Sequence, residues 1–140
     1  MVAHLIGFFV PGKPQGKGRP RFSRNVVYTP KETLQYEKLI ASCFTGNMLQ
    51  GPLFVDITAF FSIPKSYTKT QKKAIEDGIL TPTKKPDADN IGKVVMDALN
   101  GLAYEDDKQV IKLSVSKRYS ASQEGLEIII GEAYGQDQTR

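Results

Sequence analysis

The chain has 140 residues, of which 40% are hydrophobic and 24% charged, and a net charge of +4, which is ordinary for one soluble globular domain with a single core. No apolar run approaches the ~18 residues of a membrane span, and no signal-peptide pattern opens the chain. The single cysteine, Cys43, excludes an intrachain disulfide, so we expect a cytoplasmic protein in which Cys43 is a core thiol.

The first predicted element is a strand over residues 4–10, which leads into a basic loop. The strand is apolar on both faces, and this indicates a central position in a sheet. His4, the only histidine, is expected at the surface or in packing, because a lone histidine is a poor start for a zinc site. Residues 11–24 follow as a loop, since three prolines and three glycines oppose a regular element.

The loop of residues 11–24 carries five basic residues and no acid. Basic side chains and the backbone N–H groups beside glycines are suited to phosphate contacts, and Phe22 among them is suited to stacking on a base. The alternative is a mobile, solvated loop without a ligand. No Gly-Lys-Ser/Thr sequence ends the loop, which disfavours a nucleotide-binding P-loop.

The middle of the chain contains a helix, a long strand and a second, polar helix. A helical pattern covers residues 31–44, and alternation over residues 53–63 predicts a strand with one face on the core. Asp56 falls on the other face of that strand, so we expect it at the solvent side rather than in a site. Residues 68–77 form a short helix whose lysines are either solvated or grip nucleic-acid backbone.

The next stretch of the chain contains the closest grouping of side chains suited to metal binding and catalysis. Asp87 and Asp89 stand at the end of an extended segment that contains prolines, and Lys93 follows one helical turn after the second aspartate. We predict a helix over residues 90–99 with Asp89 as its N-cap. One face of that helix is apolar, and the opposite face carries Lys93 and Asp97.

A second acidic cluster, Glu105-Asp106-Asp107, follows where a short turn brings the chain back toward the same region. Clustered carboxylates repel one another, and the usual compensation is a bound divalent cation. Oxygen ligands without cysteine or histidine nearby favour Mg²⁺ or Mn²⁺ over Zn²⁺. Such an ion polarises a phosphodiester and activates water, while Lys93 would position the water or neutralise charge in the transition state.

The last predicted elements are strands over residues 109–119 and 125–132, joined as a hairpin through residues 120–125. We expect an α+β domain over residues 1–134, in which four strands form a mixed or antiparallel sheet with helices mainly on one face. The polar tail over residues 135–140 is expected to be disordered.

The run DADNIGKVVMDAL, which begins at Asp87, and the later run YEDDKQV resemble the signature of the RusA family of Holliday junction resolvases. The family pattern is Asp-x-Asp-Asn-x-x-Lys, a helix that ends Asp-Ala-Leu, and then Asp-Asp-x-Gln-Val, and this chain meets every position. The opening Pro-Gly-Lys-Pro and Gly-Lys-Gly-Arg-Pro-Arg-Phe runs are also similar to many members. The resemblance extends over nearly the whole chain, although its specific part runs from Asp87 to Val110.

The resemblance implies a RusA-like fold and a small Mg²⁺-dependent endodeoxyribonuclease, frequently encoded by prophages, that resolves four-way DNA junctions as a homodimer in recombination and repair. The residues that it implies for metal binding are Asp87, Asp89 and Asp107, with Lys93 as the catalytic lysine. Asp97, Glu105 and Asp106 would then only shape the electric field. Symmetry agrees with a dimer, because two symmetric nicks by a chain with one acidic cluster require two chains.

Two other functions stay open at this point. The chain could be a non-catalytic, basic DNA-binding module, or a metal nuclease for flaps, forks or ordinary duplex. A basic surface around an acidic pocket suits a polyanionic substrate in each case. The residues predicted to contact DNA are Lys13, Lys17, Arg19, Arg21, Arg24, Lys69, Lys72, Lys73, Lys84 and Lys85.

Overall fold

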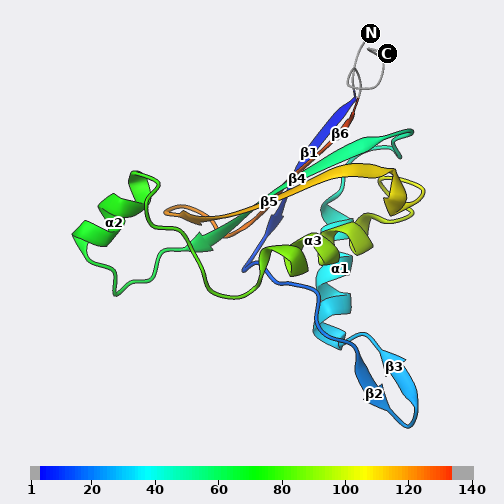
Figure 1. Cartoon of the computed structure of the whole chain (residues 1–140), viewed down its shortest axis with the longest axis horizontal. Coiled ribbons are helices and arrows are strands. Elements are labelled where there is room, and N and C mark those ends of the chain that lie inside the picture. Colours follow the sequence, from blue (N-terminus) through cyan, green and yellow to red (C-terminus); the bar gives the residue numbers. More distant parts are fainter. Residues whose placement is uncertain (1–3, 134–140) are drawn as a thin grey trace.

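The computed structural model describes residues 4–133 and shows an α+β fold built on one four-stranded sheet (Figure 1). The strands of this sheet are β1 (Leu5–Pro11), β4 (Leu53–Ser62), β5 (Val110–Ser120) and β6 (Gly125–Glu132). The helices are α1 (Lys31–Cys43), α2 (Lys69–Glu76) and α3 (Ala88–Leu99). Helices α1 and α3 cover one face of the sheet, and α2 projects from one end of the molecule. The predicted α+β class, with four main strands and helices on one face, is confirmed.

Strand β4 is the centre of the sheet because its alternating side chains supply most of one buried face. Its inward residues, from Leu53 to Phe61, are at most 1% exposed. The strand pairs antiparallel with β6 and parallel with β5. Parallel neighbours need a long crossover connection, and residues 63–109, which include α2 and α3, provide it. Asp56 is exposed on the opposite face of β4, as predicted.

The predicted hairpin between the last two strands is wrong. The strand order is β1-β6-β4-β5, so β4 lies between β5 and β6. Residues 121–124 cross the end of β4, because Ser120 of β5 pairs with Ser62 and Gly125 of β6 pairs with Phe60. A short link and alternating side chains are compatible with a hairpin, but they do not specify which strand is the hydrogen-bonded neighbour.

The predicted central position of the first strand is also wrong, because β1 is an edge strand that pairs with β6. Only one of its faces is covered: Ile6, Phe8 and Val10 face the helices, whereas Leu5, Gly7 and Pro11 on the other face are exposed. Phe8 packs edge-on against Phe44, which follows α1, with ring centroids 5.6 Å apart, and Phe9 lies against Gly125 on the other face. His4 is exposed beside the strand and contacts Glu132 at 2.9 Å.

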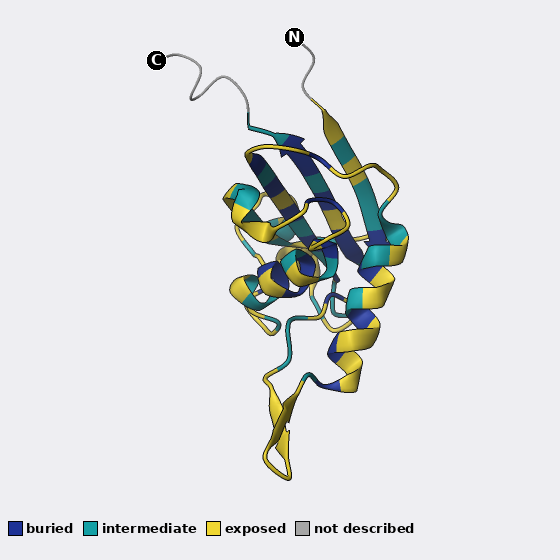
Figure 2. Ribbon diagram, turned by 90° about the vertical axis from the view of Figure 1, so that its right-hand side faces the viewer, coloured by how far each residue is buried: buried dark blue, intermediate teal, exposed yellow. Residues whose placement is uncertain are grey.

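A small hairpin, β2 (Arg21–Ser23) with β3 (Val26–Tyr28), occupies part of the region predicted as a loop. The absence of regular structure predicted for residues 11–24 is therefore wrong for its last residues. Arg24 and Asn25 form the turn, and both have left-handed backbone angles, φ 48° and φ 68°. Two consecutive left-handed residues match the type I′ turn that suits strand twist, although glycine is usual there. Figure 2 shows that the hairpin projects from the body and is exposed along its length.

The core lies between the sheet and the two covering helices. Cys43 packs against the core, as predicted. No helix within residues 4–133 has the length and apolar character needed to cross a bilayer. The polar tail predicted for residues 135–140 lies outside the described residues.

Two buried tyrosines of the core differ in how their hydroxyl groups are satisfied. The Tyr104 hydroxyl donates a hydrogen bond to the Met96 carbonyl at 2.8 Å. The Tyr36 hydroxyl is buried and has no partner in hydrogen-bond geometry among the described residues, although the Gln15 backbone lies near it. Burial raises the pKa of Tyr36 to about 12.

We expect Tyr36→Phe to leave the free energy of unfolding unchanged or raise it, because the substitution removes an unsatisfied buried hydroxyl. Tyr104→Phe is the matched control, and it should lower the free energy of unfolding by about 1 kcal/mol through the lost hydrogen bond. Urea unfolding of both variants measures the difference. Equal destabilisation by the two substitutions would contradict the contrast between the two hydroxyl groups.

Candidate active site

Helix α3 places the first acidic pair at its N-terminus. The helix begins at Ala88, two residues earlier than predicted, so its N-cap is Asp87. The predicted N-cap role of Asp89 is therefore wrong, and this residue lies in the first helical turn. The Asp87 side chain makes no capping hydrogen bond. Neither carboxylate is therefore engaged in capping the N-terminus of the helix, and both are exposed.

The two faces of α3 divide as the sequence predicts. The buried residues of the helix are Ile91, Gly92, Val94, Val95 and Leu99. Asp89, Lys93 and Asp97 follow one another at intervals of four residues and are exposed on the opposite side. Asp87, Asp89 and Lys93 form no side-chain hydrogen bond or ion pair with any residue in the described part of the chain. Their charges are thus available to a ligand.

The basic loop is held against the start of α3. The Lys17 backbone N–H donates to the Asn90 carbonyl at 2.9 Å, and the Gly18 N–H donates to the Thr33 hydroxyl at 3.0 Å. A Cβ at Gly16 would lie 2.8 Å from the Asn90 Cβ, so only glycine allows this approach. These contacts exclude a loose, solvated loop at residues 16–18.

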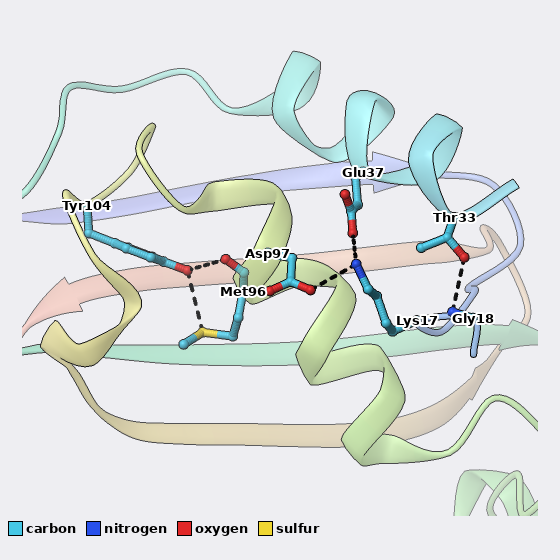
Figure 3. A network of polar contacts seen from close by, with 7 residues as sticks. All are labelled: Lys17, Gly18, Thr33, Glu37, Met96, Asp97 and Tyr104. Atoms are coloured by element: carbon cyan, nitrogen blue, oxygen red, sulfur yellow. Dashed lines mark hydrogen bonds and ion pairs between the residues drawn. The ribbon is translucent and has the colours of Figure 1, made fainter. Parts of the chain in front are cut away.

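Lys17 joins the loop to both covering helices, as Figure 3 shows. Its ammonium group contacts Glu37 of α1 at 2.7 Å and Asp97 of α3 at 3.0 Å. Partial burial acts to lower the pKa of Lys17, but the hydrogen bonds and negative charges of Glu37 and Asp97 outweigh it and raise the pKa above 10.5. Lys17, predicted as a DNA contact, therefore has a structural role in these ion pairs.

A pocket of about 370 Å³ lies where the loop meets α3. The residues that line it are Gly16, Lys17, Arg19, Lys85, Pro86, Asp87 and Asn90. Arg19 and Lys85 come from segments far apart in the sequence, and both are exposed and line the same pocket as Asp87. The segment before Asp87 is fixed to the sheet, because Lys117 of β5 donates to the Lys84 carbonyl at 2.6 Å. Cations in the same pocket as a free carboxylate are suited to hold a phosphate group near the acidic start of α3.

The second acidic cluster is held by side chains that sequence reasoning did not assign. Asp106 caps the 3-10 helix η1 (Asp107–Gln109) by accepting from the Lys108 N–H at 2.9 Å. Gln109 accepts from the Glu105 and Asp106 N–H groups and donates to two carbonyl groups of the segment before β4.

Asn100 accepts from the Asp107 N–H at 3.0 Å, and no contact within the described residues engages the Asp107 carboxylate. Asp106 thus has a structural role, while Asp107 stays available. The Asp-Asp-x-Gln-Val pattern marks Gln109 as a residue of interest. The groups that its side chain contacts could not be predicted from the sequence, because they depend on the fold.

The two acidic clusters lie at opposite ends of α3. Asp107 is bonded to Asn100, just after the helix, whereas Asp87 and Asp89 lie at its start. A helix of 12 residues is ~18 Å long. Burial and the charges of Asp107 and Asp97 raise the pKa of Tyr104, which also places Asp107 near the end of the helix. Within residues 4–133, no three acidic, histidine or cysteine side chains converge to hold a metal.

The carboxylates present fit a hard divalent cation only in part. Asp87 and Asp89 supply exposed, unpaired oxygen ligands of the kind that Mg²⁺ prefers. Asp107 has the same chemistry, but the length of α3 separates it from them. One described chain thus brings together two of the three predicted ligands.

The remaining predicted DNA contacts fall into two groups, apart from Lys84, which is exposed in the segment before Asp87. Lys13 is exposed in the basic loop, and Arg21 and Arg24 are exposed on the hairpin that follows. The lysines of α2 lie on the projecting helix, which buries none of its residues, and Lys73 pairs there with Asp77 at 3.4 Å.

A family model described as endodeoxyribonuclease RusA matches residues 11–131 of the chain. The uncharacterized protein YqaN of Bacillus subtilis (strain 168) is 41% identical over 137 residues, a match that covers 91% of this chain and 96% of that protein. The matched region contains the basic loop, the pocket and both acidic clusters.

We expect Lys17→Met to lower the free energy of unfolding by about 2 kcal/mol, because it leaves Glu37 and Asp97 close together without their shared cation. Since folding raises the pKa of Lys17, the stabilisation is complete below pH 10.5 and is lost as the pH rises through the higher pKa of the folded state.

Urea unfolding from pH 7 to pH 11 should thus show a difference between the wild type and Lys17→Met that shrinks only above about pH 10.5. Lys13→Met is the control, because Lys13 is exposed and forms no ion pair within the described residues. Similar losses for the two variants would contradict a structural role of Lys17.

Proposed function

The chain belongs to the RusA endodeoxyribonuclease family, and on that premise we propose that it is a Mg²⁺-dependent endonuclease that resolves four-way DNA junctions by paired, symmetric nicks. The main support is the pocket that Arg19 and Lys85 line together with Asp87, whose carboxylate has no partner among the described residues. A phosphodiester held by the two cations would meet the carboxylate edge. We also propose that the protein acts in the cytoplasm, in recombination and repair.

The charged residues of the proposed site divide between metal binding and charge neutralisation. Asp87, Asp89 and Asp107 would bind the divalent cation, for which Mg²⁺, or Mn²⁺ in its place, is suited by the all-oxygen ligands. When bound, such a cation supplies a Lewis acid that polarises the phosphodiester and increases the acidity of water. Lys93 would neutralise negative charge that develops on the phosphate, because no partner in the described residues engages its ammonium group.

Arg19 and Lys85 would hold the phosphate in the pocket, and this positioning reduces the entropy that the reaction loses. The exposed cations outside the pocket would follow the backbone of the DNA arms. The proposed backbone contacts are Lys13, Arg21, Arg24, Lys69, Lys72, Lys73 and Lys84.

The separation of the acidic clusters supports the proposed homodimer. If Asp107 binds the same cation as Asp87 and Asp89, a second chain must supply it, because α3 is ~18 Å long. Two copies related by a two-fold axis, with their α3 helices antiparallel, would form two such sites at once. Two sites related in this way match the two nicks needed for a symmetric junction.

We expect the wild type to nick a synthetic four-way junction in the presence of Mg²⁺ and to leave a linear duplex of the same sequence intact. Asp89→Asn should abolish nicking and shift the melting temperature without metal by no more than about 2 °C, because Asp89 is exposed and its loss also relieves repulsion. Gel electrophoresis of labelled strands and thermal melts measure the two effects.

Equal cutting of junction and duplex would refute junction resolution and leave a general nuclease. Preferential cutting of flaps or forks would identify a different branched substrate. Junction binding without nicks at any Mg²⁺ or Mn²⁺ concentration would indicate a non-catalytic DNA-binding module. A large fall in melting temperature for Asp89→Asn would make Asp89 a structural residue.

A shared site predicts that two inactive variants restore activity when their subunits are exchanged. A dimer of one Asp89→Asn chain and one Asp107→Asn chain would contain one intact site, so co-refolded chains should nick junctions on one strand only. Co-refolded Asp87→Asn and Asp89→Asn chains are the control, because every site would then lack a ligand. Absence of nicking by the first mixture would contradict a site shared between subunits.

A further inference from the structure

The hairpin β2–β3 is an exposed apolar element that no other part of the described chain covers. Phe22 is 76% exposed, Val26 and Val27 are 58% exposed, and Tyr28 is 45% exposed. An isolated two-stranded hairpin of this size has little stability of its own. Four exposed apolar side chains on one such element are more than solubility favours, and they indicate a binding surface.

The register of the hairpin divides its side chains between two faces. Phe22 pairs with Val27 across the strands, and Arg21 pairs with Tyr28. Neighbouring positions along a strand point to opposite faces. One face thus carries the apolar pair of Phe22 and Val27. The other face carries the pair of the Arg21 cation and the Tyr28 aromatic ring. Neither face meets the core, as Figure 2 shows.

The base of the hairpin is fixed to the body of the protein. Lys17 is held by ion pairs to α1 and α3, and Gly18 is bonded to the buried Thr33. On the other side of the hairpin, Pro30 is buried at the start of α1. Both ends of the hairpin are therefore anchored to the elements that form the pocket, so its base has a defined position relative to Asp87.

The charge around the hairpin identifies the class of partner. No acidic residue precedes Glu32 in the sequence, whereas Arg19, Arg21 and Arg24 lie on the hairpin or at its base. Such a surface attracts a polyanion and repels the same hairpin of a second copy. Aromatic and apolar side chains among cations are the combination that binds unstacked bases, with the cations on the phosphates.

We propose that the hairpin enters the centre of a four-way junction, where the Phe22 and Val27 face contacts base pairs next to the branch point. This inference rests on the proposed function. A continuous duplex covers the flat faces of its bases by stacking, whereas a branch point interrupts that stacking and makes base faces accessible at lower cost. The hairpin therefore supplies preference for the branch, while the arginines bind any DNA arm.

The test measures binding in the Asp89→Asn background without Mg²⁺, by fluorescence anisotropy with a four-way junction and a linear duplex of the same arm sequence. Combined Phe22→Ala and Val27→Ala substitutions should reduce the ratio of junction affinity to duplex affinity by about tenfold. Duplex affinity itself should change less than about twofold, because phosphate contacts remain. Phe22→Trp alone should keep the ratio, because it retains an aromatic ring.

Ile79→Ala is the matched control, since Ile79 is 78% exposed and lies outside the hairpin, and it should leave the ratio unchanged. Melting temperatures of the variants should match their parent, because the hairpin side chains make no core contact. In the same background, 2-aminopurine beside the branch point should increase in fluorescence on binding, and the double substitution should remove that increase.

An unchanged ratio, or equal losses on junction and duplex, would overturn the proposal. So would a double variant that elutes as a monomer when its parent is a dimer, because the hairpin would then serve a second copy of the chain. These results would not contradict the proposed nuclease function if the wild type still nicks junctions. Failure of the wild type to nick or prefer junctions would instead refute the proposed function, and with it the role of the hairpin.

Discussion

The ion pairs of Lys17 connect the three parts of the chain on which the candidate site depends. This single ammonium group brings the basic loop, α1 and α3 together, and it separates two carboxylates that would otherwise repel each other. Without it, the loop would lose its ionic attachment to the helices, which adds to the hydrogen bonds at Asn90 and Thr33 and helps to fix Arg19 in the pocket that it lines with Asp87. The arginine is free to bind a ligand because the neighbouring lysine holds the loop in place.

Helix α3 carries both the core and the proposed chemistry, and the two tasks are kept on opposite sides. The side that contains Val94 and Val95 packs against the sheet, while Asp89 and Lys93 remain charged and unpaired within the described residues. Charged groups without partners add little to stability, but they are prepared to bind substrate or metal. The same helix separates the two acidic clusters, so its length determines whether one chain is enough for a complete site.

The sequence was sufficient to predict the features that depend on local pattern. The buried and charged faces of α3, the inward face of β4 and the positions of all four main strands follow from periodicity. Tertiary neighbours could not be predicted in this way. Alternation in the last two strands does not reveal that β4 separates them, and the apolar character of β1 does not distinguish a central strand from an edge strand that is exposed on one face.

The candidate site shows the same limit. The types of residue around Asp87 were predictable from the motif, but the ion pairs of Lys17 depend on the packing of α1 against α3. The turn at Arg24 and Asn25 escaped prediction because it lacks the glycine that normally marks a type I′ turn. The distance between Asp89 and Asp107 depends on where the chain turns after α3, and no local pattern contains that information.

The position of β1 at the edge of the sheet has a consequence for the synthesis of the chain. Its strand partner, β6, is the last strand of the described chain, so β1 has no partner after its synthesis until β6 appears. At ordinary translation rates this interval is on the order of ten seconds. Throughout that time the apolar β1 segment lacks its strand partner, and the sheet closes only after β6 has been synthesised.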